Sequence, residues 1–167
     1  TQKPSSAASD VYKRQDEDAV ASVVSEIEEN GGKAKGIVAD LTKDADSKRI
    51  VTETAKYFNG LDFVWNHVGY PGPASVEGVE MDDFDLTLDL NLRTILITTD
   101  AALTELRARG GGSLLFTAST SGLAGSGFSP IYSMAKFGVV GFVRALAKRV
   151  AKDNIRANAC LLYTSDA

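Results

Sequence analysis

Apolar and polar residues alternate along the chain with two different periods. Four long stretches have the spacing, the caps or the stop signals of helices. They are residues 16–29, 42–57, 82–109 and 130–152. Short apolar runs between them are typical of strands. These runs are 34–38, 61–65, 113–118 and a fourth that begins at residue 155. We expect Thr42 to cap the second helix and the run 61–65 to be buried.

This order of elements predicts one α/β domain. Helices and strands that alternate with short links are typical of a doubly wound parallel sheet with helices on both faces. In such a sheet the functional cleft lies beyond the carboxyl ends of the strands. Asp40, Asn66 and Ser119 each follow an expected strand. We therefore expect these three polar residues to border one cleft.

Three residues in the second half of the chain suggest a hydride-transfer site. Tyr132 and Lys136 are four apart, so they share one face of the helix expected at 130–152. Ser119 ends the apolar run 113–118. A phenol, an ammonium and a hydroxyl in one cleft can deprotonate an alcohol or protonate a carbonyl.

An ordered set of short motifs extends this observation. From about residue 16 to residue 159 the chain resembles the short-chain dehydrogenases/reductases, whose fold is Rossmann-like and whose cofactor is NAD or NADP. The matching motifs are Asp40-Leu41, Asn66-His-Val-Gly69, Asn91, Gly112-Ser-Leu-Leu-Phe-Thr-Ala-Ser119, Tyr132-Ser-Met-Ala-Lys136 and Asn154-Ile-Arg-Ala-Asn158.

The resemblance implies a catalytic tetrad. In the family mechanism Tyr132 exchanges a proton with the substrate oxygen and Ser119 polarises that oxygen. Lys136 would lower the pKa of the tyrosine and bind the cofactor ribose, while Asn91 would hold a water beside Lys136. A tyrosine that acts as a base near neutral pH needs its pKa lowered by roughly 3 units from about 10.

The resemblance also implies a cofactor site. Its candidate residues are Asp40, Leu41, Asn66, Gly69, Tyr132 and Lys136. The family usually has Asn-Asn-Ala-Gly where this chain has Asn66-His-Val-Gly69. We therefore expect a structural or loop role for His67. Asp82, Asp83, Asp85 and Asp89 lie near the start of a helix and are better explained by its dipole than by a metal ion.

Both ends of the chain can be encoded by opposite strands of one nucleotide sequence. Ser9–Gln15 can be written TCA GAT GTG TAT AAG AGA CAG, and the reverse complement, read one base later, encodes Cys160–Asp166. This sequence resembles a transposon adapter from sequencing libraries. We expect 1–15 and 160–167 to be non-native segments and 16–159 to be a partial Rossmann-like domain.

The family pattern is then incomplete at both ends. Its first two strands, its glycine-rich pyrophosphate loop and the segment after its sixth strand are not found in residues 16–159. Backbone N–H groups at that lost loop normally bind the cofactor phosphates. We therefore expect the chain as written to be inactive and to expose two sheet edges, although its parent protein is an enzyme.

Composition narrows the choice of partners. The 167 residues carry a net charge of −4 with no basic patch, so nucleic acid is not an expected partner. No apolar run approaches the roughly 20 residues that span a membrane, and one cysteine fits a cytoplasmic protein. The resemblance implies a small-molecule alcohol or ketone substrate and a homodimer or homotetramer formed through helices 82–109 and 130–152.

Two other functions remain open at this point. One is a catalytically inactive nucleotide-binding or scaffold protein of the same fold. The other is a sugar-nucleotide epimerase, which also uses a Tyr-x-x-x-Lys pair. The intact tetrad favours an NAD(P)-dependent oxidoreductase, which interconverts a secondary alcohol and a carbonyl, over the first, and the Asn66-x-x-Gly69 pattern favours it over the second. The sequence does not decide between NAD and NADP.

Overall fold

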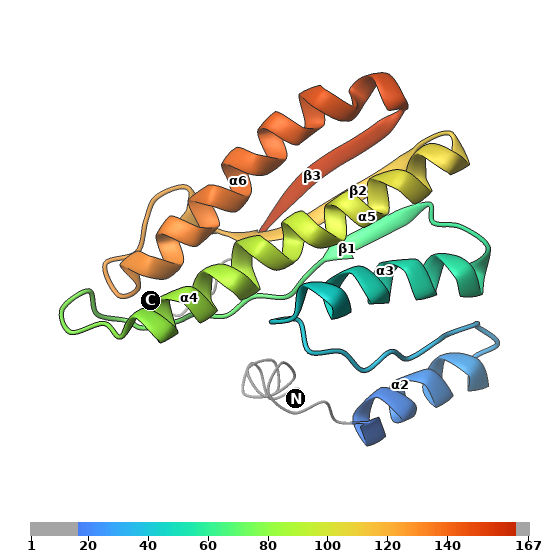
Figure 1. Ribbon diagram of the computed structural model, residues 1–167, viewed down its shortest axis with the longest axis horizontal. Helices are drawn as coiled ribbons and strands as arrows, with labels where there is room; N and C mark the ends of the chain where they lie inside the picture. Colours follow the sequence, from blue (N-terminus) through green and yellow to red (C-terminus); the bar gives the residue numbers. More distant parts are fainter. Residues whose placement is uncertain (1–16, 163–167) are drawn as a thin grey trace.

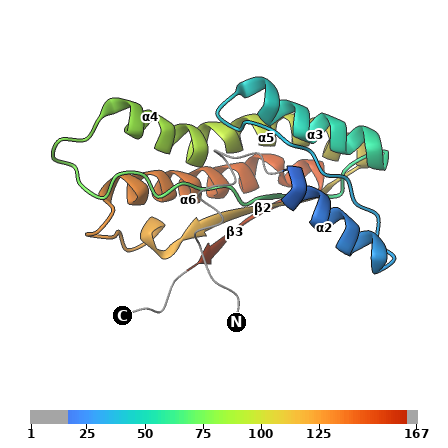
Figure 2. The same cartoon turned by 90° about the horizontal axis from the view of Figure 1, so that it is seen from below.

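A parallel sheet of three strands forms the centre of the computed structural model, which describes residues 17–162. The strands β1 (Phe63–Asn66), β2 (Gly112–Ser119) and β3 (Ile155–Leu162) pair in the order β1-β2-β3. Helices α5 (Thr94–Arg109) and α6 (Pro130–Val150) lie over one face of this sheet (Figures 1 and 2). The predicted parallel α/β arrangement is confirmed.

Two further helices precede β1 in the chain. α3 (Asp44–Phe58) packs against α5, and α2 (Glu17–Glu29) lies beyond α3 (Figure 1). The expected helices at 16–29 and 42–57 are therefore present, with bounds that differ by one or two residues. Residues 1–16 and 163–167 lie outside the described residues, whereas 160–162 pair with β2 as the end of β3. Neither fact tests the prediction of non-native ends, which remains a prediction.

The strand expected at 34–38 is wrong. Residues 32–40 join no ladder in the structure. A strand needs a neighbour to pair its backbone groups, and no described strand lies beside this segment. A side chain instead satisfies one backbone group of this segment. Arg49 Nη2 donates to the Val38 carbonyl at 2.8 Å.

The expected capping role of Thr42 is also wrong. α3 begins at Asp44 with Lys43 as its N-cap, and no side chain caps it. The Thr42 hydroxyl instead donates to Asp40 Oδ1 at 2.6 Å. This local bond competes with capping, as it often does for Thr and Asp in turns.

The long helix expected at 82–109 contains a π-helical segment. It consists of α4 (Met81–Leu88), the π-helix η1 (Asp89–Arg93) and α5. Single π-turns inside α-helices are rare and often mark functional sites. Asn91 lies in the middle of η1 and is only 1% exposed. The wider turn therefore carries a buried polar side chain at the end of α5 nearest to the carboxyl ends of the strands.

The core lies between the sheet and the helices. Phe116 of β2 is fully buried and meets the ring of Phe142 of α6 edge to face, with 5.9 Å between centroids. The opposite face of β1 is open, since Phe63 is 54% and Trp65 is 53% exposed. The expectation that the run 61–65 is buried is thus wrong for alternate residues, because side chains of a strand point to opposite faces.

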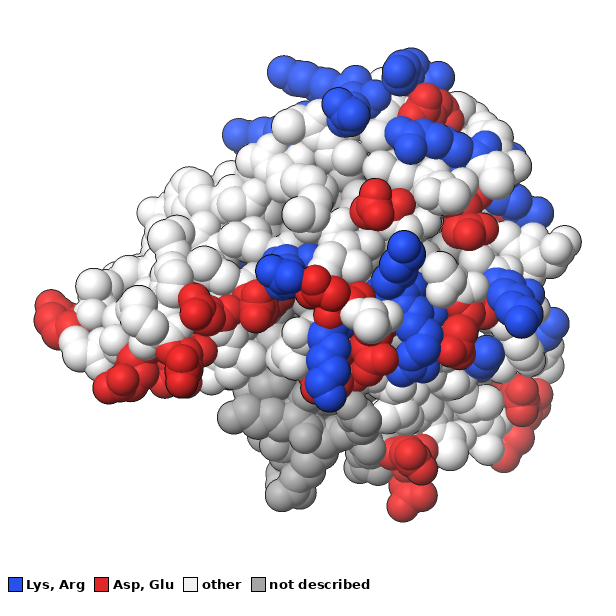
Figure 3. All heavy atoms as spheres, viewed as in Figure 1, with Lys and Arg blue, Asp and Glu red and all other residues white. Residues whose placement is uncertain are grey.

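Charges gather at opposite ends of the helical layer (Figure 3). Asp82 and Asp83 lie in the first turn of α4, whereas Lys148 and Arg149 lie in the last turn of α6. Both groups complement the dipoles of their helices. Among residues 17–162 no group of three or more His, Cys, Asp or Glu side chains is placed to hold a metal ion. No described helix combines the length and apolarity needed to cross a bilayer.

A close backbone contact fixes the loop after β2 against α6. A Cβ atom added at Gly122 would lie 2.6 Å from the Lys136 carbonyl oxygen. Gly122→Ala should therefore destabilise the fold by about 1–3 kcal/mol in chemical denaturation.

Gly141→Ala on α6 is the matched control. A Cβ at Gly141 meets nothing within 4 Å, so this change should be neutral or stabilising by up to about 1 kcal/mol. Equal effects of the two substitutions would contradict the tight contact at Gly122.

Candidate active site

Residues from four elements meet at the carboxyl end of β2. Ser119 ends β2, Tyr132 and Lys136 project from α6, and Asn91 comes from η1. The loop after β1 passes between Lys136 and Asn91 at Gly69. A Cβ atom added at Gly69 would lie 3.1 Å from Lys136 Nζ and 3.2 Å from Asn91 Oδ1. The structure therefore brings together the four residues of the expected tetrad.

Lys136 is buried without a counter-charge. Its side chain is 2% exposed, and Nζ donates to the Thr117 carbonyl at 3.0 Å. No carboxylate of residues 17–162 forms an ion pair with it. Burial lowers the pKa of Lys136 to about 8. Such a group changes its protonation readily near neutral pH.

Tyr132 lies beside this ammonium. The Lys136 Nζ atom is 5.4 Å from the centroid of the Tyr132 ring. Burial raises the pKa of Tyr132, and the nearby Ser119 hydroxyl offsets this in part. The described residues by themselves thus keep the phenol protonated. The lower pKa expected for a catalytic base remains a prediction that involves the charge of the cofactor.

Ser119 is held by the turn that follows it. Its Oγ accepts a hydrogen bond from the backbone N–H of Ser121 at 3.1 Å, and the side chain caps the short helix η2 (Thr120–Gly122). The hydroxyl also lies near Tyr132 and lowers the pKa of its phenol. Because the turn satisfies one lone pair, the hydroxyl proton can be directed towards a reacting oxygen.

Asn91 fastens the loop after β1 to the π-helix. Its Nδ2 atom donates to the carbonyls of Tyr70 at 2.7 Å and Thr87 at 2.9 Å. Its Oδ1 accepts from the Tyr70 N–H at 3.4 Å. These bonds fix Gly69 beside Lys136. The water expected between Asn91 and Lys136 stays a prediction.

The expected cofactor residues fall into two groups. Asn66 ends β1 and is 8% exposed, and its Oδ1 accepts from the Thr98 hydroxyl at 2.6 Å. Its Nδ2 atom is buried and has no partner among the described atoms. A buried donor without an acceptor is costly. This orphaned donor near the cleft fits a polar ligand such as a nicotinamide dinucleotide.

Asp40 and Leu41 form the turn that leads into α3. Asp40 Oδ1 accepts from the N–H and the hydroxyl of Thr42, and these bonds together with Lys43 lower the pKa of Asp40 despite partial desolvation. The Leu41 carbonyl accepts from the Thr94 hydroxyl at 3.0 Å. This turn is therefore rigid, and contact with the adenine stays a prediction.

Threonines connect these groups, and the sequence reasoning missed them. Thr94 binds Leu41, and Thr98, one turn later on α5, binds Asn66. Thr117 binds Lys136 through its carbonyl. The available signal was a pair of hydroxyls four residues apart in a largely apolar helix and the threonine two residues before Ser119 in β2.

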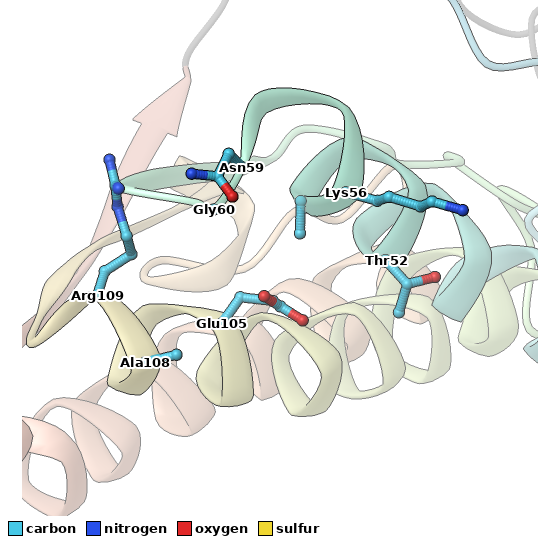
Figure 4. A pocket seen from close by; sticks show the side chains of 8 residues that line it. Thr52, Lys56, Asn59, Gly60, Glu105, Ala108 and Arg109 are labelled. Atoms are coloured by element: carbon cyan, nitrogen blue, oxygen red, sulfur yellow. The ribbon is translucent and has the colours of Figure 1, made fainter.

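The cavity between α3 and α5 belongs to the other end of the sheet. It has a volume of about 550 Å³. Figure 4 shows Lys56, Glu105 and Arg109 among the side chains that line it. Arg109 lies just before β2 begins at Gly112, whereas Ser119 lies where β2 ends. None of the tetrad residues lines this cavity.

Lys136→Met should weaken the pH dependence of stability. Because the pKa of Lys136 is about 8 in the fold against an ordinary 10.5, the unfolded chain binds this proton more tightly. The cost of the buried charge is fully present below pH 8 and vanishes above pH 10.5. The advantage of the variant in unfolding free energy should thus shrink by about 3 kcal/mol across this range.

Lys152→Met, at an exposed lysine, is the control and should show no such change. Denaturation curves at several pH values would measure both variants. A stability difference for Lys136→Met that stays constant from pH 7 to pH 11 would contradict the burial of a charged ammonium.

Curated relatives cover most of this chain. An uncharacterized oxidoreductase of Thermotoga maritima is 32% identical over 133 residues, which are 80% of this chain and 52% of that protein. The human dehydrogenase/reductase SDR family member 4 is 33% identical over 144 residues, 85% of this chain and 51% of that protein. The chain spans about half the length of the curated relatives it matches.

Solved structures show the same fold. The NADH-dependent reductase A1-R′ complexed with NAD matches with a TM-score of 0.80 and 28% identity, over 88% of this chain and 64% of that one. A short chain dehydrogenase from Burkholderia cenocepacia in complex with NADP matches with a TM-score of 0.82 and 26% identity, over 87% and 59%. The sequence profile of the family described as short chain dehydrogenase matches residues 6–166. The chain therefore belongs to the short-chain dehydrogenase/reductase family of oxidoreductases.

Proposed function

We propose that this protein interconverts a secondary alcohol and a carbonyl compound by hydride transfer, with NAD or NADP as cofactor. The observation that carries the proposal is the meeting of three groups at the end of β2. The Ser119 hydroxyl lies near the Tyr132 side chain and lowers its pKa, and the buried Lys136 ammonium lies beside the tyrosine ring. Relatives that bind NAD or NADP support the choice of cofactor.

The cofactor would be held by residues of two strand ends and α6. Asn66 offers an unpartnered Nδ2 donor, Gly69 leaves room beside Lys136, and Lys136 has donors beyond the one bound to Thr117. Asp40 and Leu41 are candidates for the adenine end. When bound, the nicotinamide supplies or accepts the hydride.

The residues of this chain handle the proton. In the reducing direction the Ser119 hydroxyl donates to the substrate carbonyl, and Tyr132 delivers its proton to that oxygen. The raised pKa of Tyr132 keeps this proton available at neutral pH. In the oxidising direction the phenol must first lose the proton, which a positive charge nearby makes easier. Lys136, with its pKa at about 8, carries such a charge at neutral pH.

The proposal for partners is a small alcohol or ketone and a second copy of the chain. Leu96 on α5 is 57% exposed, and Met134 and Phe137 on α6 are 49% and 46% exposed. Exposed apolar residues on two neighbouring helices favour burial in an interface. We also propose a cytoplasmic location, because residues 16–159, the part expected to be native, offer no cysteine pair for a disulfide.

Tyr132→Phe should reduce kcat by about 10²- to 10⁴-fold, because it removes the proton that the substrate oxygen needs. Ser119→Ala should reduce it by about 10²-fold or more through loss of a donor to that oxygen. Tyr57→Phe, at an exposed tyrosine of α3, should have no effect. The absorbance of the reduced nicotinamide would follow turnover with ketones, alcohols and sugar nucleotides.

The assay should use this chain and a chimera in which residues 17–159 replace the matching segment of a full-length relative. Turnover that survives Tyr132→Phe would contradict the mechanism. A folded chimera that binds cofactor but turns over no substrate would favour the catalytically inactive alternative. Turnover of sugar nucleotides without net cofactor reduction would favour the epimerase.

Leu96→Asp and Phe137→Asp should each shift the protein towards the monomer, because they place a charge in the proposed interface. Phe128→Asp is the control, since Phe128 is 90% exposed on the loop before α6. Sedimentation velocity would measure the three variants. A wild-type monomer, or variants that associate like the wild type, would contradict an interface through α5 and α6.

A further inference from the structure

His67 is linked to the catalytic lysine through one residue, Thr117. The Thr117 Oγ1 atom lies 2.8 Å from His67 Nδ1 and 2.9 Å from Trp65 Nε1. The backbone carbonyl of the same threonine accepts from Lys136 Nζ at 3.0 Å. One residue of β2 thus connects the histidine after β1 with the buried ammonium of α6.

The link lies where the backbone ladder between β1 and β2 stops. The last paired residues are Asn66 and Phe116, so His67 and Thr117 would form the next pair but are not part of the ladder. A side-chain hydrogen bond takes the place of that pair. Cross-strand side-chain pairs stabilise neighbouring strands in this way. The carbonyl of Thr117 remains directed at Lys136.

The direction of the hydrogen bond from Trp65 follows from the groups involved. An indole N–H only donates, so the Thr117 hydroxyl oxygen accepts from Trp65. The same hydroxyl also hydrogen-bonds His67 Nδ1, and the tautomer of the ring decides which of the two groups donates. The ring of Trp65 also contacts the His67 ring, with 4.6 Å between centroids. Two contacts from β1 therefore hold one orientation of Thr117.

We propose that His67 is a positioning residue that acts through the Thr117 hydroxyl to fix the carbonyl holding the Lys136 ammonium. No described carboxylate pairs with Lys136, so this carbonyl is its one described hydrogen-bond partner. The role gives a physical reason for a histidine where the family usually has asparagine. The effect of His67 on turnover rests on the proposed function, whereas the coupling of His67 to the pKa of Lys136 does not.

The coupling should be visible in the pKa of Lys136. A carbonyl that accepts from an ammonium favours the charged form and raises the pKa of the amine. If the carbonyl loses its fixed position, the pKa of Lys136 should fall. The groups that face Nζ are Tyr132 on the same helix and the Thr117 carbonyl of β2, and burial accounts for the lowered pKa. Competing charges therefore do not obscure the change.

The test is an NMR titration of this chain labelled with ¹³C-lysine, with the Lys136 Cε signal assigned by its loss in Lys136→Arg. The wild-type signal should titrate near pH 8. In Thr117→Val and in His67→Phe the midpoint should fall by about half a pH unit or more. Thr117→Ser keeps the hydroxyl and should restore the wild-type midpoint.

Thr99→Val is the matched control. Thr99 is 2% exposed on α5, and its hydroxyl has no partner among the described atoms, so removing it should leave the pKa of Lys136 unchanged. A wild-type midpoint in both folded variants, Thr117→Val and His67→Phe, would overturn the proposal. An equal fall in Thr99→Val would also overturn it, because the effect would then reflect general loosening of the core.

A second pair of variants keeps the test decisive if Thr117→Val does not fold. If Thr117→Val does not give a dispersed spectrum, His67→Phe with Thr117→Ser still decides the matter, since the proposal requires a fall in the first and none in the second. The titration needs no substrate or cofactor. A coupled pKa in a chimera that binds cofactor but turns over no substrate would therefore refute the proposed function and leave the positioning role intact.

Discussion

The burial of one ammonium group constrains the whole site. Lys136 is almost fully enclosed, yet the described residues offer it a single carbonyl from Thr117 and no carboxylate. A charge in such surroundings is costly unless further partners satisfy it. The cost lowers the pKa of Lys136 to about 8 and leaves donors available for a ligand. A group arranged in this way is better explained by binding and catalysis than by stability.

The elements around Lys136 hold this arrangement by close contact. Gly69 and Gly122 bring the backbone so near to Lys136 that a side chain at either position would press on its ammonium or its carbonyl. Asn91 fastens the loop that contains Gly69, and the π-helix places that asparagine in the interior. The threonines of α5 tie the Leu41 turn and Asn66 to the same helix. The site is therefore preorganised by backbone geometry and short polar bonds.

Local patterns allowed much of this to be predicted. The spacing of Tyr132 and Lys136 on one helix depends only on helical periodicity, and Ser119 at a strand end depends only on the run before it. The failures involve partners distant in sequence. The segment 34–38 has the composition of a strand, but no described strand lies beside it. The run 61–65 is apolar except for Asp62, yet only one of its faces meets the helices. The π-turn and the bonds from Thr117 to His67 depend on tertiary contacts that no short motif records.

The measurement that tests the account most directly is a titration of the Tyr132 phenol. The difference in tyrosinate absorbance between the wild type and Tyr132→Phe isolates this group, and it can be followed with and without saturating oxidised cofactor. The account predicts a midpoint above the ordinary value of about 10 without cofactor, because burial dominates. It predicts a clearly lower midpoint once the positively charged nicotinamide and Lys136 act together. A midpoint that saturating cofactor leaves unchanged would contradict the assignment of Tyr132 as the acid and base of a hydride-transfer site.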